Sequence, residues 1–191
     1  MNNVFNPDLG RDLTEQMVAT ELVYQGALLT VRRDQVRLPD GGLAGREYIV
    51  HPGAVAIIAI TNDDRIVLER QYRYPLKRHF IELPAGKIDQ GETPLATGQR
   101  ELLEETGYSA TRWTFATTIY PLIAYSDERI EIFLAEDLTL EHQRLDEGEF
   151  LEVFDVPVAT ALQWVRDGRI NDCKSVIGLL WLERLLAERR G

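Results

Sequence analysis

Residues 83–108, LPAGKIDQGETPLATGQRELLEETGY, decide the fold, because they join a glycine-bearing loop to a helix rich in glutamates. Thr93 can cap the free amides of the first turn, and Pro94 at the first helical position loses no hydrogen bond. Gly107 can adopt the left-handed conformation at which helices commonly end. We therefore expect a helix over residues 94–106.

The expected helix has one carboxylate face and one apolar face. At about 100° per residue, Glu104 and Glu105 lie within about 60° of Glu101, whereas the leucines fall on the far side. Like charges at these spacings repel one another, and Arg100 can offset Glu104 but cannot neutralise all three acids. Glutamates on a helix most often solvate an exposed face, but the remaining negative potential also suits a divalent cation.

The loop before the helix favours the metal interpretation. Its glycines and proline let backbone groups approach the start of the helix, and they bring carbonyl oxygens and a further acid there. Hard ions such as Mg²⁺ and Mn²⁺ prefer oxygen ligands and keep waters that substrate phosphates can replace. Residues 83–92 and the helix together therefore predict a divalent-metal site.

The composition indicates a folded chain with one main domain. Its 191 residues are 45% hydrophobic and 27% charged, which is close to the globular average. A net charge of −10 and a pI near 4.8 disfavour nucleic acid and anionic membranes as partners, so an anionic substrate needs an intermediary cation. The single Cys173, the lack of a signal peptide and the lack of a membrane-length apolar run predict a cytoplasmic location.

The first part of the chain is expected to form an arm. Residues 28–38 and 46–50, separated by the turn sequence PDGG at 39–42, predict an antiparallel hairpin. Two strands alone are marginal in water, so we expect the arm, residues 1–50, to pack against the main domain or a second copy. A homodimer is therefore expected.

The main domain is expected over residues 51–191. Strands on either side of the glutamate helix, with two further helices at the end, predict an α/β or α+β layered sandwich. The expected strands cover 54–60, 65–73, 111–120 and 129–135, and the expected C-terminal helices cover 159–167 and 172–190.

Residues 86–108 resemble the Nudix box. Gly86 is followed after five residues by Glu92, and after seven more by the run RELLEETGY at 100–108. Every fixed position of the family pattern is filled, and only Tyr108 stands where a small aliphatic residue is usual. The resemblance implies metal-dependent hydrolysis of a nucleoside diphosphate linked to another group. It also implies a Nudix-type α/β/α sandwich with a mixed sheet and an N-terminal antiparallel β arm.

The resemblance also implies roles for single residues. Glu101 and Glu105, with the Ala85 carbonyl, are the expected principal ligands of Mg²⁺ or Mn²⁺. Glu104 is expected as a further or water-mediated ligand with a part in catalysis. The expected structural residues of the motif are Gly86, Glu92, Arg100 and Gly107, with Glu92 and Arg100 forming an ion pair.

The C-terminal part, from residue 161 onward, is similar to the ending of ADP-ribose pyrophosphatases. In that subfamily an acidic loop after the last long strand supplies the catalytic base, and residues 145–150 match it here. Glu147 is the expected base, with Glu149 as an additional metal ligand or substitute base. The alternative is that this stretch is an ordinary solvated loop.

Further residues match positions that contact the substrate in that subfamily. Arg46 and Arg73 stand where related enzymes place arginines against phosphate or ribose, although either could be a surface ion-pair residue. Glu128 matches an acid that orients the substrate, or it is an ordinary strand-edge carboxylate. Ile123 stands where ADP-ribose-selective members usually carry proline. The sequence therefore leaves open ADP-ribose, GDP-mannose, another nucleotide sugar, or a non-catalytic module that senses nucleotides.

Overall fold

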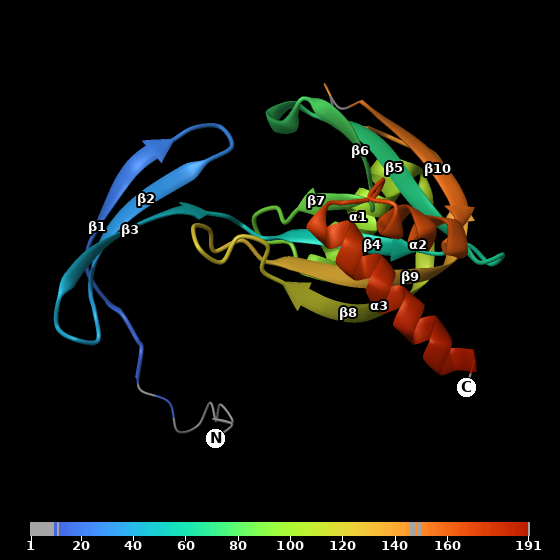
Figure 1. Ribbon diagram of the computed structural model, residues 1–191. Coiled ribbons are helices and arrows are strands. Elements are labelled where there is room, and N and C mark those ends of the chain that lie inside the picture. Colours follow the sequence, from blue (N-terminus) through green and yellow to red (C-terminus); the bar gives the residue numbers. More distant parts are fainter. Residues whose placement is uncertain (1–9, 11, 146–147, 149, 191) are drawn as a thin grey trace, which may run out of the picture. The chain divides into compact units, whose positions relative to one another are not determined.

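The computed structural model describes residues 10, 12–145, 148 and 150–190, and the chain separates into two compact units (Figure 1). The arm unit comprises Met1–His51 and Leu122–Asp127. The sandwich unit comprises Pro52–Pro121 and Glu128–Gly191. None of the helices in the described part of the chain is long and apolar enough to cross a membrane.

The arm unit contains a three-stranded antiparallel sheet in the order β1-β2-β3. β2 (Thr30–Arg37) and β3 (Leu43–Val50) form the predicted hairpin, and Gly41 in their turn has a φ of 89°. β1 (Gln16–Gln25) was not predicted. Two register shifts interrupt β1, and all ten of its residues are exposed, so its sequence lacks the alternation that marks a half-buried strand.

A short segment far along the chain completes the arm unit. The Ile49 amide donates to the Tyr125 carbonyl at 2.9 Å, and the Asp127 amide donates to the Ile49 carbonyl at 3.2 Å. The His51 amide donates to Oδ1 of Asp127 at 2.7 Å. The loop that carries Ile123 therefore belongs to the arm unit, where the Ile123 side chain is 83% exposed.

The sandwich unit contains two sheets. One is mixed, in the order β7-β4-β9-β8, with β4 parallel to β9 and antiparallel to β7. The other is antiparallel, in the order β10-β5-β6. The strands are β4 (Ala54–Ala59), β5 (Arg65–Arg73), β6 (Arg78–Glu82), β7 (Ala85–Lys87), β8 (Tyr108–Ile119), β9 (Ile130–Leu140) and β10 (Leu151–Pro157), and a 3₁₀ turn, η2 (Tyr74–Leu76), follows β5.

The central strand β4 is buried on both faces, as its continuous apolar sequence predicts. Val55 and Ile57 pack in one cluster with Leu102 of the glutamate helix. Ala56 and Ile58 pack in a second cluster, which includes residues of the two C-terminal helices. The predicted α/β/α sandwich is therefore confirmed, with α1 (Pro94–Thr106) on one side and α2 (Val158–Arg166) and α3 (Cys173–Arg190) on the other.

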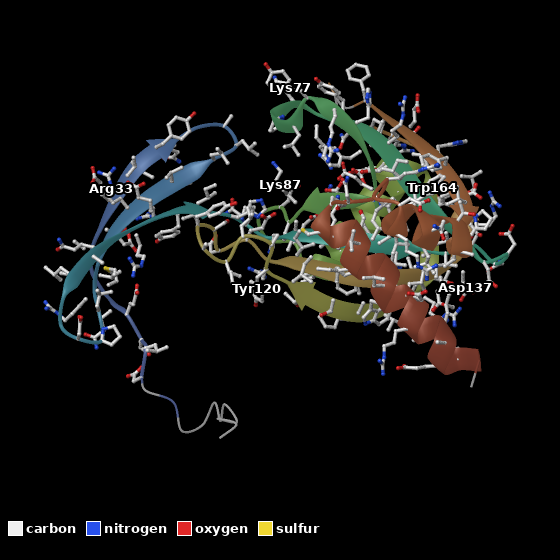
Figure 2. All side chains as sticks on the ribbon, viewed as in Figure 1. Arg33, Lys77, Lys87, Tyr120, Asp137 and Trp164 are labelled. Carbon is white, nitrogen blue, oxygen red and sulfur yellow. The ribbon has the colours of Figure 1, made fainter. Side chains whose placement is uncertain are left out.

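The strands β6, β7 and β10 were missed in the sequence. β7 has three residues, Ala-Gly-Lys, which carry no strand signal of their own, and it exists because it pairs with β4. β10 pairs with β5 along seven positions, and its Phe154 packs against Trp164 of α2 with ring centroids 6.2 Å apart. Figure 2 labels Trp164 on this helix. These strands depend on tertiary partners more than on local sequence.

Candidate active site

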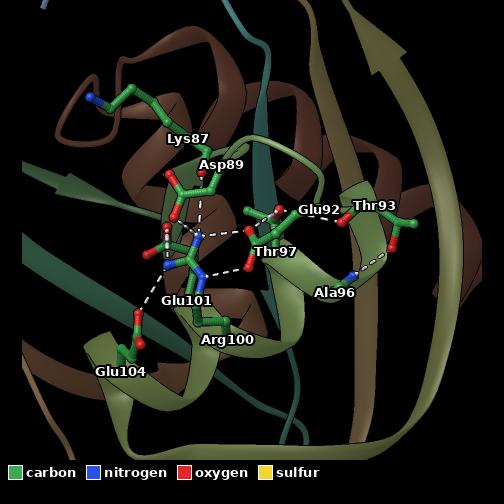
Figure 3. A network of polar contacts seen from close by, with 9 residues as sticks. All are labelled: Lys87, Asp89, Glu92, Thr93, Ala96, Thr97, Arg100, Glu101 and Glu104. Atoms are coloured by element: carbon green, nitrogen blue, oxygen red, sulfur yellow. Dashed lines mark hydrogen bonds and ion pairs between the residues drawn. The ribbon is translucent and has the colours of Figure 1, made fainter.

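The glutamate helix α1 begins and ends where the sequence predicts. Oγ1 of Thr93 accepts a hydrogen bond from the Ala96 amide at 3.2 Å (Figure 3), and Pro94 occupies the first turn. Gly107 has a φ of 74°, and its amide donates to the Leu103 carbonyl. A Cβ at position 107 would lie 2.9 Å from the Gln143 amide nitrogen, so glycine is needed there for both conformation and space.

Gly86 allows the loop to approach Glu101 closely. A Cβ built on Gly86 would lie 1.8 Å from Oε1 of Glu101, a separation at which the carboxylate would have to move. The Glu101 side chain is 15% exposed. The absence of a side chain at position 86 therefore fixes where the Glu101 carboxylate can lie.

Glu105 is held against the same loop. Its residue exposure is 4%, and its Oε2 accepts a hydrogen bond from the Ala85 amide at 3.0 Å. Ala85 is the residue whose carbonyl is the expected backbone ligand. The loop and the helix thus bring Ala85, Glu101 and Glu105 to one place.

Arg100 lies at the centre of the polar network in Figure 3. Its Nε and Nη2 each lie 3.0 Å from a carboxylate oxygen of Glu92, in the paired geometry that the resemblance implies. Its Nη1 donates to Glu101 at 2.9 Å and to Glu104 at 3.0 Å. Hydrogen bonds from Arg100 and then from Thr97 lower the pKa of Glu92 from 4.5 to about 2. The hydrogen bond with Glu92, and after it those with Glu104 and Glu101, raise the pKa of Arg100.

The donor chemistry of this place fits a hard divalent cation, since it consists of carboxylate oxygens and a backbone carbonyl. As the side chains stand, no group of three or more His, Cys, Asp or Glu residues in the described ranges is arranged to hold a metal ion. Nη1 of Arg100 bonds to both Glu101 and Glu104, so binding of a metal by those two carboxylates must compete with Arg100. This competition is a feature that the sequence did not predict.

A second set of charged residues lies on the sheet wall that faces α1. Along β5, the side chains of Val67, Glu69 and Arg73 share one face, and Val67 packs in the same cluster as Leu102 of α1. Arg73 pairs with Glu82 of β6 through two hydrogen bonds of 2.8 Å, Nε to Oε1 and Nη2 to Oε2. Arg73 is therefore an ion-pair residue with a side chain that is still 41% exposed.

Four charged residues were not singled out in the sequence: Glu69 and Glu82 on this wall, and Asp172 and Lys174 at the start of α3. Glu69 and Glu82 are 0% and 3% exposed, and the signal that could have found them is an acid directly after apolar strand residues, residues 66–68 in β5 and Phe80 and Ile81 in β6. Lys174 in the first turn of α3 contacts Glu82, and it gave no signal in the sequence.

The other expected site residues are placed as follows. Arg46 lies in the arm unit and pairs with Glu15, with its Nε 2.9 Å from Oε2 of that residue. Glu128 lies just before β9 and is partly buried. Glu147 and Glu149 lie outside the described residues.

The last turn of α1 is bonded to the chain segment that leads toward the expected base. Nε2 of Gln143 donates to the Glu105 carbonyl at 2.5 Å, and the Arg144 amide donates to the Glu104 carbonyl at 2.9 Å. Residues 143 and 144 therefore lie directly beside the backbone of the helix that carries the glutamates.

The structure thus combines a layered α/β/α sandwich with a glycine-bearing loop that packs against a helix of glutamates. Comparison with known proteins gives the family. The NUDIX domain model matches residues 50–171, and the model of the nucleoside diphosphate sugar hydrolase N-terminal domain matches residues 15–49. The chain belongs to the Nudix family and is a Nudix hydrolase, and dependence on a divalent metal is general in that family.

Three relatives are similar over nearly the whole chain. An ADP-ribose pyrophosphatase of Bacillus subtilis (strain 168) is 39% identical, over 91% of this chain and 95% of the relative. A methanol dehydrogenase activator of Bacillus methanolicus is 38% identical, over 92% and 96%. A crystal structure of an ADP compounds hydrolase has a TM-score of 0.83 at 25% identity, covering 94% of this chain and 98% of that one.

Proposed function

We propose that this chain hydrolyses the pyrophosphate bond of ADP-ribose or a related nucleoside diphosphate sugar with Mg²⁺ or Mn²⁺. The products are a nucleoside monophosphate and a sugar phosphate. One observation carries the proposal: Gly86 admits the Glu101 carboxylate to the loop at which Glu105 bonds to Ala85. The names of the relatives, an ADP-ribose pyrophosphatase and an ADP compounds hydrolase, support the choice of substrate.

The proposed ligands of the cation are Glu101, Glu105 and the Ala85 carbonyl, with Glu104 as a further or water-mediated ligand. A bound divalent cation would neutralise charge on the pyrophosphate and lower the pKa of a coordinated water. Around it, Arg100 has a structural role, because it orients Glu92, Glu101 and Glu104. Gly86 and Gly107 are proposed as structural residues because each allows a close backbone approach.

The proposed reaction is attack of water on one phosphorus atom. A bond forms between the water oxygen and phosphorus, and the bond from that phosphorus to the bridging oxygen breaks. The water proton goes to Glu147, the proposed general base, while Glu149 serves as a further metal ligand or substitute base. The bonds of Gln143 and Arg144 to the end of α1 support this assignment, because the chain approaches the acidic loop from beside Glu104.

The proposed contacts to the substrate are Arg73 and Arg46 for phosphate or ribose, and Glu128 for orientation. Arg73 has the strongest support, since it lies on the wall that faces α1 and has N–H groups that bond to no residue in the described part of the chain. Ile123, in place of the usual proline, makes GDP-mannose or another nucleotide sugar the alternative substrate. A module that binds nucleotides without cleaving them is the alternative outside enzymes.

The test is a panel of ADP-ribose, GDP-mannose, NADH and diadenosine polyphosphates with Mg²⁺, with the released phosphomonoester as the readout. We expect ADP-ribose to be cleaved to AMP and ribose 5-phosphate, and the same panel without metal to give no product. Faster cleavage of GDP-mannose identifies the alternative substrate. Binding of ADP-ribose without release of any phosphomonoester from the panel would identify a sensor and contradict the proposal.

We also propose that residues 1–50 form a dimerisation arm for a cytoplasmic homodimer, with residues 51–191 as the hydrolase domain. Every residue of β1 is exposed, and the exposed side chains include large apolar ones such as Met17 and Leu22. Apolar side chains gathered on one strand favour burial against another surface. A second copy of the arm offers the same apolar strand as a partner.

Light scattering after gel filtration tests the dimer. We expect the wild type to have twice the chain mass of 21.8 kDa, and Leu22→Asp to have the mass of one chain. Leu180→Asp in α3 is the matched control, because Leu22 and Leu180 are both 48% exposed. A monomeric wild type, or a dimeric Leu22→Asp variant, contradicts the proposed arm.

A further inference from the structure

A continuous network of alternating charges runs from the wall that faces α1 to the start of α3. Arg73 of β5 bonds to Glu82 of β6, and Glu82 in turn pairs with Lys174 in the first turn of α3. Nζ of Lys174 also lies 3.2 Å from Oδ1 of Asp172. The side chains of Glu82 and Lys174 are only 4% and 11% exposed, so the central pair of the network is largely shielded from water.

The strand register shows that the Arg73 side chain lies along β5 rather than across to the residue opposite it. Arg73 lies opposite Arg78, whereas Glu82 lies opposite Glu69, four residues back along β5. The Arg73 side chain must therefore run back along the strand to reach Glu82. Among the described residues, Glu82 is the one whose carboxylate forms hydrogen bonds with the Arg73 guanidinium.

The first turn of α3 fixes Lys174 relative to β6. Oδ1 of Asp172 accepts the Ser175 amide at 3.1 Å, and Oγ of Ser175 accepts the Leu83 amide at 2.8 Å. Ser175 is fully buried. Lys174 and Ser175 thus hold two consecutive residues, Glu82 and Leu83, just before the loop that contains Ala85.

Glu82 and Lys174, the two partners of the buried ion pair, are both charged at neutral pH. Burial alone would raise the pKa of Glu82, but the hydrogen bond from Arg73 and the charge of Lys174 outweigh it, and the pKa is lowered. Burial would likewise lower the pKa of Lys174, but the charges of Asp172 and Glu82 outweigh it, and the pKa is raised. Glu82 is therefore a carboxylate held from two sides by cations.

The pairing leaves Arg73 able to bind a ligand. A guanidinium has five N–H groups, and the bonds to Glu82 use Nε and one hydrogen of Nη2. Nη1 makes no hydrogen bond to another residue of the described part of the chain. The side chain is 41% exposed, and it lies on the face of β5 whose Val67 packs with Leu102 of α1. The hydrogen bond to Glu82 is the main cause of its raised pKa, and the charges of Glu69 and Glu105 contribute less.

We propose that Lys174 is a positioning residue that acts through Glu82 to orient the Arg73 guanidinium, so that its unused N–H groups bind a phosphate of the substrate. This inference rests on the proposed function. Lys174 does not itself touch the substrate. The competing explanation is that the network only stabilises the junction of β6 and α3.

A double-mutant cycle separates the two explanations, because a residue that acts only through Arg73 loses its effect when Arg73 is altered. We expect Lys174→Met to raise KM for ADP-ribose by about 10-fold, roughly one well-oriented charge-assisted hydrogen bond, with kcat changed less than about twofold. In an Arg73→Lys background, which lacks the guanidinium fork, Lys174→Met should change KM by less than about twofold.

Lys77→Met is the control for the exchange of lysine for methionine, because Lys77 is exposed and contacts Tyr74 rather than this network. We expect its KM to equal that of the wild type. The same rise in KM from Lys174→Met in both Arg73 backgrounds would overturn the proposal, and so would an unchanged KM in the wild-type background. If Lys174→Met does not fold, Lys174→Gln, which keeps a donor and loses the charge, is read by the same criteria.

The cycle is also measured as dissociation constants for α,β-methylene-ADP-ribose, which needs no turnover. A wild type that binds this analogue but cleaves no substrate refutes the proposed hydrolysis. The double-mutant cycle can still be measured in that case from the dissociation constants. A wild type that does not bind it overturns the positioning role as well, since that role requires a phosphate ligand.

Discussion

Replacement of Gly86 by alanine is the sharpest perturbation that the site offers. The added Cβ would lie 1.8 Å from Oε1 of Glu101, whereas real Cβ contacts essentially never fall below 3.0 Å. The carboxylate must therefore retreat by about 1.2 Å or more, away from the loop that carries Ala85. The atoms that collide belong to the end of a flexible side chain, so the backbone need not move.

The expected consequence is a loss of activity in a protein that still folds. A displacement of about 1 Å at a reacting centre can reduce the rate about 100-fold, equivalent to about 2.7 kcal/mol in the activation free energy. Gly86 is not among the residues with a positive φ, so alanine introduces no backbone strain there. We expect the free energy of unfolding to fall by no more than about 1–3 kcal/mol, the usual cost of overpacking, so the protein remains folded.

The assay is kcat/KM for ADP-ribose at several Mg²⁺ concentrations, alongside urea unfolding of the same proteins. Gly45→Ala is the matched control, because a Cβ at Gly45 meets no atom within 4 Å. We expect the Gly86→Ala variant alone to lose activity and to need more Mg²⁺. Normal activity in Gly86→Ala, or equal losses in both variants, would refute the reasoning that the empty space at Gly86 serves Glu101.

Three further predictions concern single carboxylates. Glu105→Gln should remove most metal-dependent turnover while the fold remains, because the amide oxygen can still accept the Ala85 amide; unchanged turnover would exclude Glu105 from the mechanism. Glu147→Gln should greatly lower kcat with little change in metal affinity, measured by titration with Mn²⁺, and full activity would assign the base to Glu149 instead. The pKa of Glu92 is lowered from 4.5 to about 2, so its pairing stabilises the fold above pH 4.5 and is lost as the pH falls toward 2. The difference in Tm between wild type and Glu92→Gln should therefore shrink over that range, and a constant difference would contradict the assignment.

The parts of the fold that the sequence predicted are those with local causes. The helix α1 begins at Pro94 and ends at Thr106 as expected, because Thr93 caps it and Gly107 terminates it through contacts within a few residues. The run of apolar residues at 54–60 predicted a doubly buried strand for the same reason, since its own composition demands burial. β1 was missed because bulges break its alternation and exposure removes its hydrophobic pattern.

Relative positions of side chains could be predicted where spacing along one helix determines them, but contacts between distant segments could not. The contact of Arg100 with Glu104 follows from their i, i+4 spacing, whereas the pairing with Glu92 was expected from the resemblance to the family motif. The pairing of Glu82 with Lys174 joins residues 92 positions apart, and the sequence pattern of neither segment predicts it. A buried ion pair depends on tertiary packing, which local sequence does not encode.

The central claim is that Ala85, Glu101 and Glu105 together hold a divalent cation at the pyrophosphate. The most direct test is a crystal of the protein with Mn²⁺ and α,β-methylene-ADP-ribose, measured at a wavelength at which manganese scatters anomalously. We expect a manganese peak bonded to both carboxylates and to the Ala85 carbonyl at about 2.2 Å, beside the diphosphate of the analogue. Manganese and analogue bound elsewhere, with Glu101 still paired to Arg100, would contradict the account.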